Sequence, residues 1–206
     1  MKVLIQQVQI NDPRSTHHGS RTDILIEAGI IKDIQTNIKT EADQVIKGGN
    51  LQISPGWVDV FAQFGDPGLE HKETIETGVA AAAAGGFTDV FIIPNTQPVI
   101  DSKSQVQYIT HRSANLPVTV HPIGAVSKNT EGKDLAEMYD MRASGAIAFS
   151  DGLHPVQSAG LLVKALQYIR AFEGVLIQIP DDTSIGAHGL MHEGVVSTQL
   201  GLSGKP

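Results

Sequence analysis

Residues 55–68 read PGWVDVFAQFGDPG, and the pattern of the chain changes at this stretch. The Pro-Gly pair is a turn signal, and the apolar segment 57–61 that follows it is typical of a buried strand. Further apolar strands are expected at 89–93, 117–123, 146–149 and 175–179, with helices between them at 74–84, 104–111, 134–141 and 156–172. Apolar strands that alternate with helices predict βα units and a parallel sheet buried on both faces.

The segment before residue 55 has a different pattern, with short strands and tight turns. We expect strands at 3–8, 23–27 and from residue 30, and turns at Asn11-Asp12-Pro13 and Ala28-Gly29. Hairpins at this spacing indicate a small β-sandwich or an open sheet. The sequence therefore predicts two domains, residues 1–54 and residues 55–206.

Composition excludes several classes of protein. The 206 residues carry a formal net charge of −7, which argues against a surface that neutralises nucleic-acid phosphates. There is no cysteine, so disulfides and thiolate metal sites are excluded. The apolar run at the N-terminus is too short for a signal peptide, and the weakly polar run 77–93 is interrupted by glycines and Asp89. We expect a cytoplasmic protein that does not span a membrane.

A series of motifs resembles the dihydroorotases, in particular the long bacterial type related to the multifunctional pyrimidine-synthesis protein. In chain order they are PGWVDV (55–60), DPGLEHKETIETG (66–78), AAAAGGFT (81–88), PNTQPV (94–99), PIGA (122–125), GAIAFSD (145–151) and MHEGVVS (191–197). The resemblance covers nearly the whole chain. It implies an α/β fold of the amidohydrolase type, a (β/α)8 barrel with a small composite β-sandwich. Residues 1–54 would supply the N-terminal part of the sandwich, and residues 55–206 the first five β/α units.

The resemblance also implies where the chemistry would be, because reactive groups of such barrels lie at the carboxyl ends of the strands. Active relatives have a His-x-His zinc pair after the first strand, then an Arg that holds the substrate carboxylate. The matching residues here are Phe61, Gln63 and Gly65, and the family's histidine after the fifth strand falls on Ile179. Phenylalanine and isoleucine offer no ligand atom, and a glutamine oxygen suits zinc poorly.

Two polar positions of the family are retained. Asn95 corresponds to a residue that helps to hold the substrate carboxylate, so it is our one candidate substrate-binding residue. The paired Asp-Asp-Gly after the fourth strand is here Asp151-Gly152-Leu153, so one aspartate of the pair remains. Without three imidazoles, nothing in this sequence supplies the zinc-activated hydroxide that attacks a cyclic amide. We therefore expect no metal site, no cofactor and no catalytic residue of the family's kind.

The histidines that remain have mostly structural interpretations. We expect His17-His18, His71 and His111 to be solvated, and His121 to lie in the core or at the barrel mouth. His188 and His192 are four residues apart, so on a helix they could form a two-ligand face, although their glycine-rich surroundings favour a loop. His154 follows the fourth strand and could line the mouth. Asp181-Asp182 could act as a general acid and base, but a loop that begins a helical element is the favoured interpretation.

Two functional hypotheses follow from the resemblance. The first is a dihydroorotase-like protein of pyrimidine biosynthesis that is catalytically impaired, a pseudoenzyme kept for binding or assembly, with aspartate carbamoyltransferase as a candidate partner. The alternative is an active cyclic-amide hydrolase that interconverts carbamoyl-aspartate and dihydroorotate with a rearranged site around Asp151 or His154. A barrel of five strands exposes two sheet edges and an apolar inner face. We therefore expect the chain to be a fragment of a protein about twice as long, or else to be completed by another chain, and we favour the fragment. We also expect a homo-oligomer.

Overall fold

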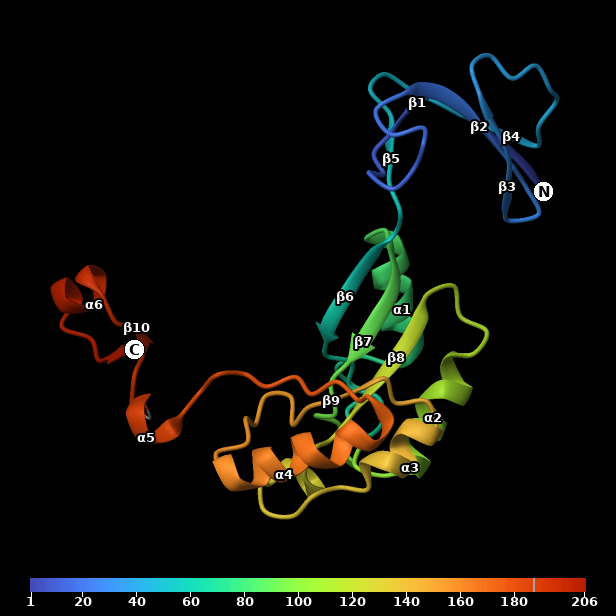
Figure 1. Cartoon of the computed structure of the whole chain (residues 1–206). Coiled ribbons are helices and arrows are strands. Elements are labelled where there is room, and N and C mark those ends of the chain that lie inside the picture. Colours follow the sequence, from blue (N-terminus) through green and yellow to red (C-terminus); the bar gives the residue numbers. More distant parts are fainter. Residues whose placement is uncertain (187) are drawn as a thin grey trace. The chain divides into compact units, whose positions relative to one another are not determined.

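The computed structural model describes residues 1–186 and 188–206, and backbone contacts divide the chain into two units, Met1–Gly56 and Trp57–Pro206 (Figure 1). The first unit contains β1 (Lys2–Ile10), β2 (Arg21–Glu27), β3 (Ile30–Gln35), β4 (Gln44–Lys47) and β5 (Gln52–Ile53). The second contains β6 (Trp57–Ala62), α1 (Ile75–Ala84), β7 (Phe87–Ile92), α2 (Lys103–Ser113), β8 (Thr119–Gly124), η1 (Lys128–Thr130), α3 (Met138–Ala143), β9 (Ala148–Phe149), α4 (Ala159–Ile169), η2 (Arg170–Phe172), α5 (Thr183–Gly186), β10 (Met191–His192), α6 (Val195–Leu200) and β11 (Gly204–Lys205).

The first unit is a single sheet with the strand order β3-β2-β1-β4, and β5 also pairs with β1. The first three strands form the expected antiparallel hairpins. Ala28 and Gly29 both have positive φ, the backbone of the tight turn that matches the twist of a hairpin. The short strands β4 and β5 were not predicted from the sequence, and both run parallel to β1.

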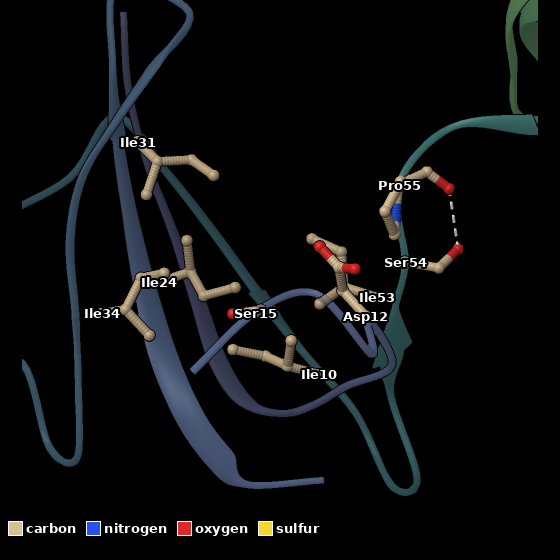
Figure 2. Close-up of a pocket in the computed structure, with 9 residues that line it drawn as sticks. All are labelled: Ile10, Asp12, Ser15, Ile24, Ile31, Ile34, Ile53, Ser54 and Pro55. Atoms are coloured by element: carbon tan, nitrogen blue, oxygen red, sulfur yellow. Dashed lines mark hydrogen bonds between the residues drawn. The ribbon is translucent and has the colours of Figure 1, made fainter. Parts of the chain in front are cut away.

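One face of this sheet carries an apolar hollow of about 210 Å³ (Figure 2). Five isoleucines supply most of its lining: Ile10, Ile24, Ile31, Ile34 and Ile53. Ile10 and Ile24 are buried in the small core of this unit, whereas Ile31 is more than half exposed. The described residues of this unit form one of the two layers that a sandwich requires.

In the second unit, four strands lie side by side and parallel in the order β6-β7-β8-β9, as the sequence predicts. The helices α1 and α2 pack on this sheet, and the buried side chains between them form the main core, which includes Ile75, Val90 and Ile109. Thr74 caps α1 through a reciprocal capping box with Thr77, which explains why the helix begins at Ile75. The fold is thus α/β, with part of a parallel barrel.

The fifth predicted strand, 175–179, is reduced to a single parallel bridge between Phe149 and Leu176. Two backbone hydrogen bonds form it: Phe149 N–H donates to Val175 O, and Ile177 N–H donates to Phe149 O. Its partner β9 is only two residues long, so the ladder has little strand to extend along. The prediction of a full fifth strand is therefore wrong in extent, although the neighbour and the parallel direction are correct.

Candidate functional site

The sheet of the second unit has two faces with different side chains. Val90 and Ile92 of β7 point toward the helices, so Phe91 and Ile93 point the opposite way, because side chains alternate along a strand. A second apolar cluster lies on that opposite face, the inner face of the barrel. Its buried members are Ile93, Ile123 and Ala148, and the partly buried side chains packed against them are Phe61, Phe91 and Ile177.

Phe61, which the resemblance matches to the family's first zinc ligand, belongs to this apolar cluster. It is the fifth residue of β6, and its N–H donates to the Asp59 carboxylate over 3.0 Å. The cluster gives it hydrocarbon neighbours from β7, β8 and β9. A phenyl ring in these surroundings offers no ligand atom, so this side chain cannot coordinate a metal ion.

The other replaced positions do not fit zinc either. Gln63 is exposed and Ile179 is half-buried. Across the described ranges 1–186 and 188–206, no three His, Cys, Asp or Glu side chains are grouped closely enough to hold a metal ion. Of the three replaced positions, Gln63 alone offers a donor atom, an amide oxygen, and these three side chains do not fit zinc.

Gly65, which the resemblance matches to the family's arginine, is enclosed by backbone atoms of Leu69 and Glu73. A Cβ added to Gly65 would lie 2.5 Å from Leu69 O and 2.9 Å from Glu73 O. The Leu69 N–H also donates to Gly65 O over 2.6 Å, which closes this turn tightly. An arginine at position 65 would therefore require the segment 69–73 to move.

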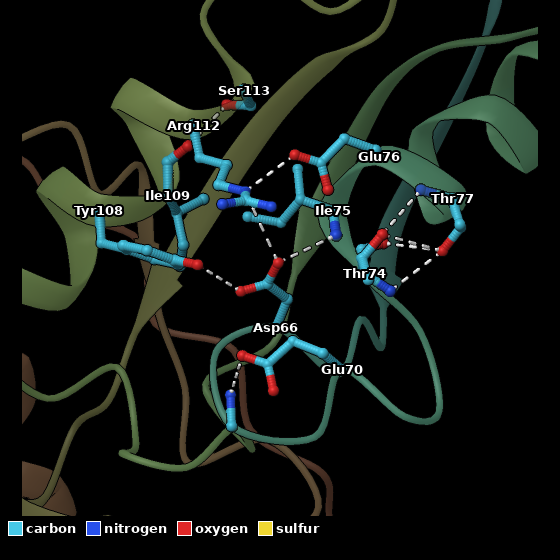
Figure 3. A network of polar contacts seen from close by, with 11 residues as sticks. Asp66, Glu70, Thr74, Ile75, Glu76, Thr77, Tyr108, Ile109, Arg112 and Ser113 are labelled. Carbon is cyan, nitrogen blue, oxygen red and sulfur yellow. Dashed lines mark hydrogen bonds and ion pairs between the residues drawn. The ribbon is translucent and has the colours of Figure 1, made fainter.

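A polar network fixes the start of the same loop (Figure 3). Asp66 is fully buried, and its carboxylate accepts hydrogen bonds from Tyr108 Oη at 2.7 Å and from Ile75 N at 3.3 Å. Arg112 donates to Glu76 at 2.8 Å, and its Nε lies 3.9 Å from Asp66. The hydrogen bond to Asp66 raises the pKa of Tyr108. The network ties the loop after β6 to both α1 and α2. Sequence motifs did not predict this network, because Tyr108 and Arg112 lie 42 residues or more beyond Asp66 in the chain.

Asn95 follows β7 and contacts the loop that follows β9. Its Oδ1 accepts from Leu153 N at 2.9 Å, and its Nδ2 donates to Asp151 O at 3.3 Å. Between these contacts, Gly152 has a φ of +60°, and a Cβ there would lie 1.9 Å from Asn95 Oδ1. The structure thus brings Asn95 and Asp151 together, with protein groups filling the space between them.

Asp151 is 1% exposed and its carboxylate is enclosed by donors. Oδ1 accepts from Val126 N at 2.8 Å and from Ser127 N at 2.9 Å, and Oδ2 accepts from the Ser127 hydroxyl. Burial raises the pKa of Asp151, and the Ser127 and Val126 donors oppose that rise. The side chain acts as a tie between the loop after β9 and the loop after β8.

Of the remaining histidines, His154 adjoins Asp151, because its N–H donates to Asp151 O at 3.1 Å. His121 is half-buried on β8, and its Nε2 is 2.8 Å from Asp89 Oδ1 on β7. This hydrogen bond lowers the pKa of Asp89. His154 is exposed on the turn after β9. His188 lies in a turn and His192 in β10, so the helical two-ligand face is wrong.

His17 is half-buried and His18, His71 and His111 are exposed. Asp182 accepts from the N–H and the hydroxyl of Ser184, which lowers its pKa and begins α5. Asp181 lies 2.7 Å from Lys205 Nζ. The two aspartates thus make separate local contacts, as expected for a loop that begins a helical element.

Comparison with solved structures identifies the class of fold. An L-hydantoinase (dihydropyrimidinase) from Arthrobacter aurescens superposes with a TM-score of 0.73 at 22% identity, over 90% of this chain and 42% of that one. A crystal structure of a dihydroorotase superposes with a TM-score of 0.62 at 13% identity, over 85% of this chain and 50% of that one. The parallel strands of the second unit are therefore part of an amidohydrolase-type TIM barrel.

Sequence comparison narrows this class. Residues 49–206 match the family model described as dihydro-orotase-like. The dihydroorotases of Syntrophotalea carbinolica and Pelotomaculum thermopropionicum are each 40% identical to the chain over 100% of its length. The chain belongs to the dihydroorotase-like family. It spans about half the length of the curated relatives it matches, 48% in both cases.

Within residues 1–186 and 188–206, no helix is both long enough and apolar enough to cross a membrane. The longest helices, α2 and α4, have 11 residues each. A membrane-spanning helix needs about 20.

Proposed function

We propose that this chain is part of a dihydroorotase-like protein of pyrimidine biosynthesis in which the family's zinc chemistry has been lost. The observation that carries the proposal is Phe61, which packs with Ile93, Ile123 and Ala148 at the position of a zinc ligand. Gln63 and Ile179 leave the other two imidazole positions equally unfit. Such a protein would serve binding or assembly, and aspartate carbamoyltransferase is the partner that the resemblance names.

Gly65 supports the same proposal from a different direction. Holding a substrate carboxylate by a two-pronged guanidinium contact is a large part of recognition in such sites. The backbone oxygens of Leu69 and Glu73 leave no room for a side chain at position 65. The loss therefore concerns substrate recognition as well as metal binding.

A rearranged catalytic site is the second candidate, and one observation favours it. A hollow of about 350 Å³ lies between the loops after β8, after β9 and after residue 179. Its lining includes three titratable side chains, Glu131, His154 and Asp181. Glu131 pairs with Lys133 and Asp181 with Lys205, so both carboxylates already have cationic partners.

Turnover assays distinguish the two candidates. The whole protein should show no interconversion of carbamoyl-aspartate and dihydroorotate, with or without added zinc, because no zinc-bound hydroxide is available to attack the cyclic amide. A dihydroorotase that retains its histidines serves as the positive control. Metal-dependent turnover that disappears in His154→Ala would support the rearranged site and refute the pseudoenzyme. Co-elution with aspartate carbamoyltransferase on gel filtration tests the assembly role, and separate elution of the two proteins would count against that partner.

A further inference from the structure

We infer that Asn95 is a positioning residue, a clamp on the turn Asp151–Leu153, and that its partner in this role is Gly152. The inference is independent of whether the protein turns over a substrate. It assigns the amide of Asn95 to contacts within the protein, with the backbone of Asp151 and Leu153.

The contacts of Asn95 carry the first step. The amide spans the turn, because Oδ1 accepts from the N–H of Leu153 and Nδ2 donates to the carbonyl of Asp151. A single side chain thus satisfies one backbone donor and one backbone acceptor on either side of Gly152. These two groups lie 56 and 58 residues from Asn95 along the chain, so the clamp joins the end of β7 to the end of β9.

Gly152 carries the second step, because two separate features require glycine there. Its φ of +60° lies in the left-handed region, which L side chains adopt at a cost. Its missing Cβ would also lie 1.9 Å from Asn95 Oδ1 and 2.9 Å from Asn95 Cγ. The side chain of Asn95 therefore lies directly against the open face of the glycine, and the two residues fit each other.

Further hydrogen bonds within residues 150–154 stabilise the same turn. The N–H of Gly152 donates to Ser150 Oγ at 2.9 Å, and the N–H of His154 donates to Asp151 O at 3.1 Å. Asp151 itself is tied to Ser127. Leu153 and His154, which the turn exposes, line the 350 Å³ hollow between the mouth loops. Asn95 thus shapes this hollow by fixing the turn that supplies part of its lining.

Thermal unfolding of the whole protein tests the fit between Asn95 and Gly152. Gly152→Ala should lower Tm by several degrees more than Gly132→Ala, the matched control. Gly132 has a similar φ of +67° but nothing within 4 Å of the position of a Cβ. The excess should shrink by about 4 °C or more when Asn95→Ala is also present, because alanine removes the atoms that clash, whereas the effect of Gly132→Ala should not change. Equal losses for the two glycine variants, or no change in the Asn95→Ala background, would overturn the inference.

Hydrogen exchange in the single variant Asn95→Ala gives a second readout that does not require the double variant to fold. The amide of Leu153 should exchange about tenfold faster, because it loses its acceptor. The amide of Val126, which donates to Asp151, should keep its protection. The NMR signals of the His154 ring should shift in Asn95→Ala and stay in place in Gly132→Ala. Unchanged exchange at Leu153 would show that Asn95 does not clamp the turn.

Discussion

Replacing Asp151 by alanine is expected to lower the free energy of unfolding by about 3 kcal/mol. The substitution leaves buried donors without an acceptor, and each unsatisfied donor costs about 1–3 kcal/mol. The donors are the N–H groups of Val126 and Ser127 and the Ser127 hydroxyl. For a chain of this size the corresponding fall in Tm is roughly 6–12 °C. Asp140→Ala is the control, because Asp140 is an exposed residue of α3. Equal stability of the two variants would contradict the role of Asp151 as a tie between loops.

Asp151→Asn adds a test of pH dependence. The amide keeps an oxygen for the two N–H donors, so this variant should be far more stable than Asp151→Ala. Burial raises the pKa of Asp151 above the ordinary 3.8. The stability that its proton contributes is therefore fully present below 3.8 and is lost as the pH rises through the raised pKa. Denaturant titrations should show wild type losing stability relative to Asp151→Asn over this interval. The opposite slope would mean that the donors outweigh burial.

Replacing Phe61 by histidine is expected to destabilise the protein by about 2 kcal/mol, because it removes packing and introduces a polar ring beside apolar side chains. The neighbours concerned are Ile93, Ile123 and Ala148. Phe61→Leu is the matched control, since it keeps an apolar side chain at the same position, and it should cost less. The measurement is the midpoint of denaturant unfolding with an unchanged slope.

Added zinc should not rescue Phe61→His, because one imidazole cannot form the site alone. For the same reason, neither Gln63→His alone nor Ile179→His alone should create a zinc site. A triple variant with Phe61→His, Gln63→His and Ile179→His would still lack an arginine that binds the substrate carboxylate. Adding Gly65→Arg would not supply one, because its side chain would collide with the backbone oxygens of Leu69 and Glu73. A zinc-dependent rise in the Tm of Phe61→His by several degrees would reveal ligands that the present account does not contain.

The sequence predicted the parallel order of the strands because apolar segments and helix signals alternate from residue 57 onward. Local patterns also marked the turn at Ala28-Gly29 and the helix at 74–84, which the structure has at Ile75–Ala84. Strands β4 and β5 were not predicted. Strand β4 has four residues, all exposed, and β5 has two, so neither shows a recognisable alternation of apolar and polar residues. The strand predicted at 175–179 failed for the opposite reason. Its apolar pattern is strong, but the partner strand β9 is too short to extend the ladder.

The candidate site was predictable in position but not in the way its residues are used. The resemblance placed Phe61, Asn95 and Asp151 at the carboxyl ends of strands, where the structure has them. What the retained polar groups contact depends on loops that meet across 24 to 58 residues of sequence. The room at Gly65 and Gly152 is likewise a property of the folded loops, because it is set by atoms of Leu69, Glu73 and Asn95.

The most direct test of the account is the zinc content of the whole protein after extensive dialysis, measured by elemental analysis. The account predicts no stoichiometric zinc, because Phe61, Gln63 and Ile179 stand at the three positions that the resemblance matches to imidazole ligands. A histidine-bearing dihydroorotase carried through the same dialysis shows that the procedure retains bound metal. One or two zinc ions per chain would contradict the central claim.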